Sequence, residues 1–383
     1  MSGPIIYKGR GTPEMYDDLM DFMNYVFGFN GDDRDFKKLL PKLYKPEYDP
    51  CYSNYVVTED GKLKAAIGAF DSLFSVNGKI LKVRGIGNVA VHPYSRSKGY
   101  MKDCLRMALR DMIEDGVDFS LLGGQRQRYQ HFGYEHGGVE YAVSVDHGNL
   151  RRAFEGVPLV PMELCDVNEG DDALIDRIYA LHASRPVRCV RPREQFYDIA
   201  RSWRSSLTAV MKDGEFRGYF IGDLQELTLT DPSELTDVVR NYVRQRGDVT
   251  IRFAPWDTES IAAVTAFGGS PSSHPCEMFN IFNFTRVIGA LLRFKASLEE
   301  LGNGELTLLI HGFAGDEKIR IAVKQNEVTV EEAVPSSEAQ MELGHIEAVS
   351  FLTGLFSAKR RTLSPAVRSW FPLPLFVDSA DHV

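Results

Sequence analysis

The sequence has few cysteines and no long apolar run, and each absence excludes a class of protein. The cysteines are far apart and odd in number, so neither a disulfide framework nor a paired metal-binding knuckle is visible. They are Cys51, Cys104, Cys165, Cys189 and Cys276. No apolar stretch approaches the ~18 residues that span a bilayer, and residues 1–10 lack the pattern of a signal peptide. We therefore expect a cytoplasmic protein with reduced thiols, no bound metal and no membrane partner.

The chain also lacks an excess of positive charge. Its formal net charge is -9 and its isoelectric point is about 5.6, which argues against a nucleic-acid partner because binding to phosphates needs a basic face. An acidic chain suits a cationic small molecule better, although acidity is also common in proteins that only need to stay soluble. The hydrophobic fraction of 44% is typical of folded proteins, and 383 residues predict two or three domains.

Residues 1–148 form the first expected domain. Apolar residues recur at three- and four-residue intervals from Glu14 to Phe27, which predicts an amphipathic helix. Short runs rich in Val, Ile and Phe flank Asp60-Gly61 and Asn77-Gly78, and these dipeptides predict the tight turns of an antiparallel meander. We expect a buried strand at 83–91, a helix at 98–114 and a further strand at 118–122.

Residues 149–277 form the second expected domain, which begins with an aperiodic connector at 148–161. We expect helices near 171–184 and 192–203, a hairpin that turns at Asp213-Gly214, a helix near 233–245 and a strand at 249–254. This order roughly repeats that of the first domain, which suggests a tandem duplication. The second copy lacks a glycine-bearing basic turn between its strand and helix, so we expect that it has lost any cofactor site.

Residues 278–383 form the third expected domain. A helical pattern at 285–301, three alternating strands between 304 and 334 and a second helix at 344–356 predict a small α+β unit. The fold class expected for the whole chain is therefore mixed, α+β and α/β.

One segment carries the chemistry: "NVAVHPYSRSKGYMKDCL", in which Arg96-Ser97-Lys98-Gly99 joins a strand to a helix. A tight glycine-containing turn at a helix N-terminus points backbone N–H groups into one concavity, and the helix dipole adds partial positive charge, so the turn can hold a pyrophosphate. Gly99 allows close approach of the anion, and the strand edge from Val89 to Val91 could pair with an extended ligand arm. The alternative is an ordinary turn with solvated basic residues.

A second segment, "RQRYQHFGYE", follows the next strand and places Tyr129 five residues before Tyr134. With these two segments the sequence resembles the GNAT superfamily, whose fingerprint Arg/Gln-x-x-Gly-x-Gly/Ala matches Arg96 to Met101 except for its last residue. The resemblance implies acetyl-CoA as co-substrate and Tyr129 as the general acid for the departing thiolate, a role that suits a phenol with a pKa of ~10. The alternative for Tyr129 is a core aromatic. The expected cofactor-binding residues are Val89, Ala90, Val91, Arg96, Ser97, Lys98, Gly99, Tyr100, Met101, Gly124 and Gln125.

The layout of the full chain resembles the Eis-like acetyltransferases, most specifically in residues 83–138. That resemblance implies tandem GNAT domains, of which the second is degenerate, a C-terminal domain of sterol-carrier-protein fold, and assembly into a hexamer. It implies direct N-acetylation of a polyamine, an aminoglycoside-like acceptor or a lysine side chain. It also implies that the C-terminal carboxylate, here that of Val383, enters the active site as the base. The alternative for the tail is a frayed terminus.

Three further groups of residues are weaker candidates. His92, His131 and His136 could relay protons, although histidines near turns are more often surface residues. A cluster of arginines could bind the nucleotide phosphate of CoA, but a solvated connector that caps the next helix is the preferred interpretation; its members are Arg185, Arg188, Arg191 and Arg193. A set of aspartates could attract an amine, but a plain solvent face is preferred; these are Asp17, Asp18 and Asp21.

Two rival functions stay open. One is a tandem-GNAT aminoacyl or fatty-acyl transferase, such as the peptidoglycan-bridge or N-myristoyl enzymes. The other is a lipid-binding protein that senses CoA, which would need a continuous apolar tunnel in residues 278–383. No cysteine lies beside a recognisable histidine and acid, so we expect a ternary complex and no covalent enzyme intermediate.

Overall fold

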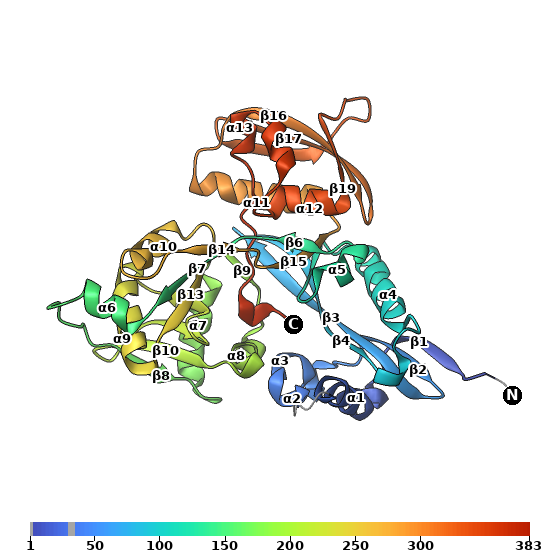
Figure 1. Cartoon of the computed structure of the whole chain (residues 1–383), viewed down its shortest axis with the longest axis horizontal. Coiled ribbons are helices and arrows are strands. Elements are labelled where there is room, and N and C mark those ends of the chain that lie inside the picture. Colours follow the sequence, from blue (N-terminus) through green and yellow to red (C-terminus); the bar gives the residue numbers. More distant parts are fainter. Residues whose placement is uncertain (1–2, 30–34) are drawn as a thin grey trace.

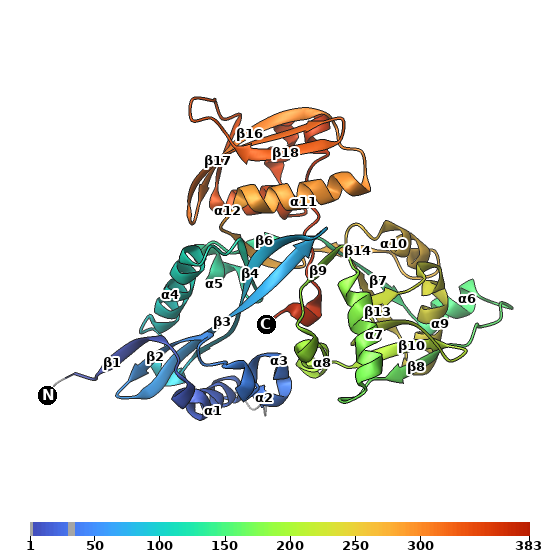
Figure 2. The ribbon, with the colours of Figure 1, turned by 180° about the vertical axis from the view of Figure 1, so that it is seen from behind.

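A computed structural model of the protein describes residues 3–29 and 35–383. Three units surround the C-terminal segment, which ends in the middle of the molecule (Figures 1 and 2). In the described part of the chain, no helix is long and apolar enough to cross a membrane.

The first unit is built on a twisted sheet with the strand order β1-β2-β3-β4-β5-β15-β6, to which β9 adds by pairing with β3. The predicted meander is confirmed, because β2, β3 and β4 pair antiparallel. Both predicted turn dipeptides have positive φ, 47° and 77° at Asp60-Gly61 and 46° and 78° at Asn77-Gly78, as a tight hairpin requires. The strands are β1 (Ile6–Arg10), β2 (Asn54–Glu59), β3 (Lys62–Val76), β4 (Lys79–Val91), β5 (Phe119–Leu122), β6 (Glu135–Gly137), β9 (Val187–Cys189) and β15 (Glu277–Ile281).

Helices cover both faces of this sheet. The predicted helix at 14–27 is present as a 3-10 turn, η1 (Pro13–Met15), followed by α1 (Tyr16–Gly28), and it packs on one face together with α2 (Phe36–Leu39) and α3 (Pro41–Tyr44). The other face carries α4 (Tyr100–Glu114), which was predicted at 98–114, and α5 (Arg126–Tyr129). The predicted inward residues of α4 do pack on the sheet; they are Met101, Leu105, Ala108, Leu109 and Met112.

The sheet of the first unit splits where β4 outruns β5. The two strands pair in parallel from Val83 with Phe119 to Ile86 with Leu122, after which β5 ends and β4 continues to Val91. Asn88 has a φ of 52°, and the register between β3 and β4 shifts near this point, which is the geometry of a β-bulge. A wedge, bounded by residues 87–91 of β4 and by Gly123, therefore opens in the sheet.

The second unit has two short sheets, β12-β11-β10-β8 and β13-β7-β14. The predicted hairpin forms from β10 and β11, and Asp213-Gly214 again has positive φ, 52° and 77°. The predicted helices appear as α7, α8 and α9. The elements of this unit are β7 (Glu140–Val145), β8 (Glu163–Asp166), α7 (Asp172–Ala183), η5 (Arg193–Gln195), α8 (Phe196–Arg201), η6 (Ser202–Arg204), β10 (Leu207–Lys212), β11 (Glu215–Ile221), β12 (Glu226–Leu229), η7 (Pro232–Glu234), α9 (Leu235–Arg246), β13 (Val249–Phe253), α10 (Thr258–Thr265) and β14 (Ser272–His274).

The first two units exchange strands. β7 precedes residue 148 in the chain, yet it pairs with β13 and β14 of the second unit. Reciprocally, β15 follows the second unit in the chain, yet it lies between β5 and β6 of the first sheet. No single cut in the chain therefore separates the two sets of hydrogen-bonded strands. The segment 148–161, expected to be an aperiodic connector, contains the helix α6 (His147–Ala153), which begins with a capping box between Asp146 and Asn149.

The third unit is an α+β domain in which two helices pack against a sheet with the strand order β18-β17-β16-β19. The predicted helices and strands are present, and β19, which the sequence patterns did not reveal, pairs in parallel with β16. One apolar core joins this unit to the first, since Phe119 and Phe279 lie in the same cluster as Phe284 and Leu291. Its elements are α11 (Phe284–Leu298), β16 (Gly304–Gly312), β17 (Gly315–Lys324), β18 (Glu327–Glu332), β19 (Met341–Gly344), α12 (His345–Thr353), η8 (Ala358–Thr362), α13 (Pro365–Arg368) and η9 (Ser379–Asp381).

Candidate functional site

The Arg96-Ser97-Lys98-Gly99 turn lies at the N-terminus of α4, as predicted. Gly99 is the N-cap residue with a φ of 84°, a conformation that glycine adopts without strain. All four turn residues are exposed, whereas Tyr100 immediately after them is buried. Met101, which stands where the fingerprint has a small residue, packs partly buried against the apolar core under α4.

The turn presents free hydrogen-bond donors. The first N–H groups of any α-helix have no acceptor within the helix, and here the first backbone acceptor engaged is the Gly99 carbonyl, by Asp103 N–H at 3.1 Å. Among the described residues, the N–H groups of Ser97, Gly99, Tyr100 and Met101 find no other acceptor. Such a set of donors, with the helix dipole behind it, fits a diphosphate.

Lys98 is held beside this turn by an acid on β2. Its Nζ lies 2.7 Å from Glu59 Oε1, and the Tyr100 hydroxyl donates to the same oxygen. The lysine side chain is 45% exposed, so it can reorient toward a bound anion. Arg96 is exposed at the other end of the turn.

The expected strand edge and the Gly124-Gln125 segment face each other across the wedge. Val89 and Val91 are half-buried against the α4 core, while Ala90 between them is fully buried and pairs with Ala66. On the opposite side, Gly124 has a φ of 126° and Gln125 is the N-cap residue of α5. One edge of β4 from residue 87 to 91 thus lacks a β5 partner, as binding of an extended arm requires.

Tyr129 ends α5 and packs against this wedge. It is 5% exposed, and a Cβ placed on Gly124 would lie 3.2 Å from its Cε2 atom. Burial raises the pKa of Tyr129, although Arg128 opposes the shift. The neighbouring Tyr134 is completely buried, and its hydroxyl bonds to Ser120 Oγ at 2.7 Å. Tyr129 therefore combines both features, a place in the apolar core and a place at the wedge.

The C-terminus of the chain enters the wedge from the other side. A Cβ on Gly85 would lie 2.7 Å from Val383 Cγ2, and one on Gly87 would lie 3.0 Å from the terminal carboxyl carbon. Val383 packs against the core that contains Phe70 and Ala90. The two glycines of β4 make room for the last residue, so the tail is inserted in the molecule and is not frayed.

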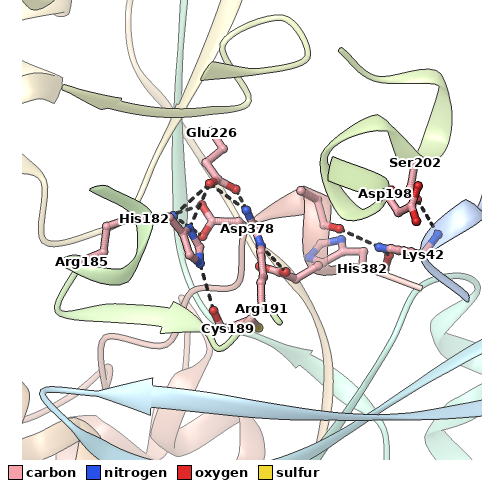
Figure 3. A network of polar contacts seen from close by, with 12 residues as sticks. Lys42, His182, Arg185, Cys189, Arg191, Asp198, Ser202, Glu226, Asp378 and His382 are labelled. Atoms are coloured by element: carbon pink, nitrogen blue, oxygen red, sulfur yellow. Dashed lines mark hydrogen bonds and ion pairs between the residues drawn. The ribbon is translucent and has the colours of Figure 1, made fainter. Parts of the chain in front are cut away.

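Buried ion pairs from the second unit hold the tail in place (Figure 3). Arg191 is 1% exposed and binds Glu226 Oε2 at 2.6 Å and Asp381 Oδ1 at 2.8 Å. Burial alone would raise the pKa of Asp381, but the Arg191 guanidinium outweighs it and lowers that pKa. The same guanidinium holds the pKa of Glu226 well below its usual range against the effect of burial.

Arg185 adds a second pair to this network, with Nη1 2.9 Å from Asp378 Oδ2 and 3.3 Å from Glu226 Oε1. Both interpretations of the arginine cluster, a phosphate site and a solvated connector, are therefore wrong for Arg185 and Arg191, because their partners are buried carboxylates of distant segments. Arg193 does lie at the surface, where it pairs with Asp172 and Asp176 of α7. Arg188 donates from Nη1 to the Arg185 carbonyl at 2.7 Å.

Lys42, on α3 of the first unit, binds the C-terminal tail. Its buried Nζ donates to the carbonyl oxygens of Ala380 at 2.6 Å and His382 at 2.5 Å. Burial lowers the pKa of Lys42 to about 8, against the attraction of Asp381. Trp203 of the second unit donates to the same His382 carbonyl at 3.2 Å. The penultimate peptide is thus fixed by both units, and sequence reasoning had singled out neither Lys42 nor Trp203.

His382 and Glu277 meet beside the wedge. His382 Nδ1 lies 3.2 Å from Glu277 Oε2, and that carboxylate lies close to Gly123 at the end of β5. Burial lowers the pKa of His382 to about 4, aided by Lys42, and raises the pKa of Glu277 to about 7. Burial therefore favours the neutral form of both groups, so their contact is not a fully charged ion pair. Glu277 is a member of the exchanged strand β15, which no local sequence pattern brings to this place.

Two cavities flank Val383. One of about 410 Å³ extends from Val383 and Gly85 to Tyr179 and Ile199 of the second unit. The other, of about 460 Å³, is bounded by Gly123, Trp203, Ser205 and His382. Both have the size of small-molecule sites, and the last residue lines both.

The remaining candidates do not converge on the wedge. His131 and His136 are exposed, and His92 lies in an aromatic group with Phe22, Tyr25 and Tyr94. The aspartates of α1 lie on its solvent face, which was the preferred interpretation of the sequence; these are Asp17, Asp18 and Asp21. Residues 3–29 and 35–383 contain no group of His, Cys, Asp or Glu side chains arranged to hold a metal ion.

Comparison with known proteins agrees with this geometry. Residues 10–137 match the family described as Acetyltransferase (GNAT) domain. Full-length structural likeness is found to a conserved protein of unknown function from Enterococcus faecalis, with 16% identity, a TM-score of 0.67 and 100% of both chains covered. A GCN5-related N-acetyltransferase from Kribbella flavida gives 17% identity and a TM-score of 0.65, with 100% of this chain and 99% of that chain covered. Eis1 from Mycobacterium abscessus gives 12% identity and a TM-score of 0.63, with 99% of this chain and 100% of that chain covered.

At these identities the structural likeness establishes the fold, and no curated protein matches the sequence. The function rests on the family match and on the site. GNAT acetyltransferases use acetyl-CoA, and the matched residues include the donor turn, the open edge of β4 and Tyr129. The chain therefore carries a GNAT acetyltransferase domain in residues 10–137 and is an acyltransferase enzyme.

Proposed function

We propose that the protein is an acetyl-CoA-dependent N-acetyltransferase that modifies a primary amine of a small cationic molecule. The acceptor class includes polyamines, aminoglycoside-like compounds and lysine side chains. One observation carries the proposal: a single wedge in the first sheet has the free N–H groups of the α4 turn at its mouth, Tyr129 on one wall and the terminal residue Val383 on the other.

In the proposed reaction both substrates are bound together, and the cofactor residues are those predicted from the sequence. The turn from Arg96 to Met101 would hold the diphosphate, and the open edge of β4 would align the pantetheine arm toward Gly124. The amine nitrogen attacks the acetyl carbonyl carbon, while a main-chain N–H near Val91 polarises the carbonyl oxygen. The carbon–sulfur bond then breaks.

Two groups manage the protons. The departing thiolate takes the proton of the Tyr129 hydroxyl, which burial keeps protonated at neutral pH by raising its pKa. The proton lost by the amine passes to the C-terminal carboxylate of Val383. The network around Lys42, Arg185 and Arg191 supports this role, because it fixes the backbone of the preceding residues.

We further propose that residues 149–277 are a degenerate second GNAT unit and that residues 278–383 have a sterol-carrier-protein fold. The repeated strand order supports the first point. The helix α9 is preceded by Asp231 and Pro232 in place of a basic glycine turn, and Asp231 accepts from Ser233 N–H, so the helix start would repel a diphosphate. Assembly into a hexamer in the cytoplasm remains part of the same proposal.

The rival functions make different demands. A lipid-binding protein would need an apolar tunnel in the third unit, but Phe284, Leu291 and Trp370 fill its interior and are completely buried. An aminoacyl or fatty-acyl transferase would need a different donor. Comparing acetyl-CoA with longer acyl-CoA thioesters in the assay below therefore separates these functions.

The test is thiol release from acetyl-CoA in the presence of a panel of amines. Native protein should turn over at least one amine, whereas Tyr129→Phe and a chain that lacks Val383 should lose most of kcat. Tyr94→Phe is the matched control, because Tyr94 is 81% exposed near the same turn and should keep native turnover. Calorimetry that detects no binding of acetyl-CoA at millimolar concentration would refute the proposal.

A further inference from the structure

Two strands of the second unit, β12 and β13, lie at the ends of different sheets. β12 pairs with β11 and β13 pairs with β7, but among the described residues no ladder joins β12 to β13. A hydrogen bond links the strands just before β12 begins, from Gln225 Nε2 to the Thr250 carbonyl at 3.4 Å. Beyond this bond β12 has an open edge, as β4 has beyond the end of β5 in the first unit.

A cavity of about 310 Å³ lies between the two strands. The consecutive residues 225–229 line it along β12, and residues 252–254 line it at the end of β13. Successive side chains of a strand point to opposite faces of its sheet, so a cavity that touches every residue from 225 to 229 borders the edge of β12. Its volume lies at the lower end of the range for small-molecule sites.

The edge of β12 presents main-chain hydrogen-bonding groups to this cavity. In an antiparallel pair, alternate residues direct both N–H and C=O to the partner strand. Thr230 N–H donates to the Arg217 carbonyl at 2.8 Å, so Thr228 also faces β11. The alternate residues, Leu227 and Leu229, therefore face the open edge, and in the described part of the chain their N–H groups find no other acceptor. Thr228 Oγ1 is buried at the same place without a hydrogen-bond partner.

The side chains around the cavity favour an uncharged ligand over an anion. Leu235, Phe253 and Trp256 give it apolar and aromatic surface. Pro232 before α9 has no N–H to offer a phosphate. Three carboxylates line the cavity against two guanidinium groups, so a further negative charge would be unfavourable. The carboxylates are those of Glu226, Asp257 and Asp378, and the guanidinium groups are those of Arg185 and Arg252.

From this arrangement we infer that the cavity between β12 and β13 binds a short extended peptide, which adds to β12 as a further strand. Leu227 and Leu229 are two residues apart, about 6.7 Å along a strand, and alternate residues of an extended peptide carry N–H and C=O groups at the same spacing. Apolar side chains of the peptide would pack against Leu235, Phe253 and Trp256. The site belongs to the second unit, and the inference does not rest on the proposed function.

The test compares two peptides that differ in their N–H groups. Acetyl-Ala-Leu-Ala-amide has a capped end, so it carries no amine that the protein could acetylate. Calorimetry with the full-length protein should detect its binding at concentrations up to about 1 mM. The matched peptide has the N–H groups of all three residues methylated, which removes these donors in every register. Its Kd should be roughly tenfold higher or more, because the carbonyl oxygens of β12 lose their partners. Equal Kd values, or no binding of the first peptide, would overturn the inference.

Variants of the protein test the location. Ser260→Phe fills the cavity from α10 and should raise the Kd of the unmethylated peptide roughly tenfold or more. Glu259→Phe adds the same ring at the adjacent, exposed position and is the matched control, which should keep the native Kd. If Ser260→Phe binds like the native chain, or if Glu259→Phe loses as much affinity, the peptide binds elsewhere and the inference is wrong.

A third variant tests the pairing with β12. Leu229→Pro removes the N–H that faces the open edge and keeps the groups that pair with β11. It should weaken binding of the unmethylated peptide roughly tenfold, and an unchanged Kd in the folded variant would contradict strand addition. If Leu229→Pro does not fold, Ser260→Phe and the methylated peptide still decide the question, because neither alters β12.

Discussion

Replacing Arg191 by methionine should deprive two buried carboxylates of their shared cation. The Arg191 side chain is 1% exposed, as is that of Glu226, and that of Asp381 is 7% exposed. Removing one member of a buried ion pair typically costs 3 to 5 kcal/mol, because the remaining charge loses its partner in a medium of low dielectric constant. We therefore expect the free energy of unfolding to fall by about 4 kcal/mol in Arg191→Met.

The assay is urea unfolding followed by tryptophan fluorescence, and Arg193→Met is the matched control. Arg193 also binds two carboxylates, Asp172 and Asp176, but its side chain is 31% exposed and those of its partners are 77% and 65% exposed. Exposed ion pairs contribute about 0 to 1 kcal/mol, so the control should stay within about 1 kcal/mol of the native chain.

A rescue variant tests the electrostatic cause. Combining Arg191→Met with Glu226→Gln and Asp381→Asn removes the unpaired charges while it keeps the side-chain volumes nearly constant. We expect at least half of the lost free energy of unfolding to return. If Arg191→Met is as stable as Arg193→Met, or if the triple variant recovers nothing, the network does not hold the tail by charge pairing and the reasoning is refuted.

Three further predictions concern the wedge. Reversing the charge in Lys98→Glu should raise the Kd for CoA roughly tenfold in calorimetry, and an unchanged Kd would exclude the turn as the diphosphate site. Tyr129→Phe should lower kcat at least 100-fold with little change in the KM for acetyl-CoA. A rise in KM with an unchanged kcat would contradict its role as acid. The pKa of Glu277, raised to about 7 by burial, makes the native state bind the extra proton, so this group favours folding below about pH 4.5 and loses that contribution as the pH rises to 7. Glu277→Gln should remove this loss. Between pH 4 and pH 8, its free energy of unfolding in urea should therefore rise by up to about 3 kcal/mol relative to that of the native chain.

Local signals in the sequence predicted the elements around the site well. The turn dipeptides at Asp60, Asn77 and Asp213 require positive φ, and each forms the expected hairpin. The period of apolar residues in α1 and α4 is set by the faces that they bury, so both helices were predicted within two residues at their starts. The donor turn at Gly99 follows from the same local order of strand, glycine and helix.

The exchange of β7 and β15 could not be predicted in this way. The two strands occupy equivalent positions in their sheets. β7 lies between β13 and β14, and β15 lies between β5 and β6. A short apolar strand carries no signal for which of two similar slots it enters, because the hydrogen-bond ladder is the same in either. Glu277 reaches the wedge only through this exchange, which is why its place beside His382 was not predicted.

The arginine cluster was misinterpreted for a related reason. Four arginines within nine residues are typical of a solvated segment when only their neighbours in the sequence are considered. The partners of Arg191 are 35 and 190 residues away in the chain, and those of Arg185 are equally remote. Ion pairs between distant segments leave no periodic trace, so burial of these side chains became visible only in the fold.

The charges of this network link the second unit to the C-terminal tail. Lys42 of the first unit and Arg185 and Arg191 of the second are three cations, and in the described residues Glu226 is the carboxylate outside the tail that pairs with the two arginines. Asp378 and Asp381 of the tail supply two more, so the buried charges balance only when the tail is inserted. Because an unbalanced buried charge is costly, the second unit favours the inserted tail over a free one. Val383 is thereby fixed against Gly87 in the wedge of the first unit, so the second unit helps to place the residue that is proposed as the base.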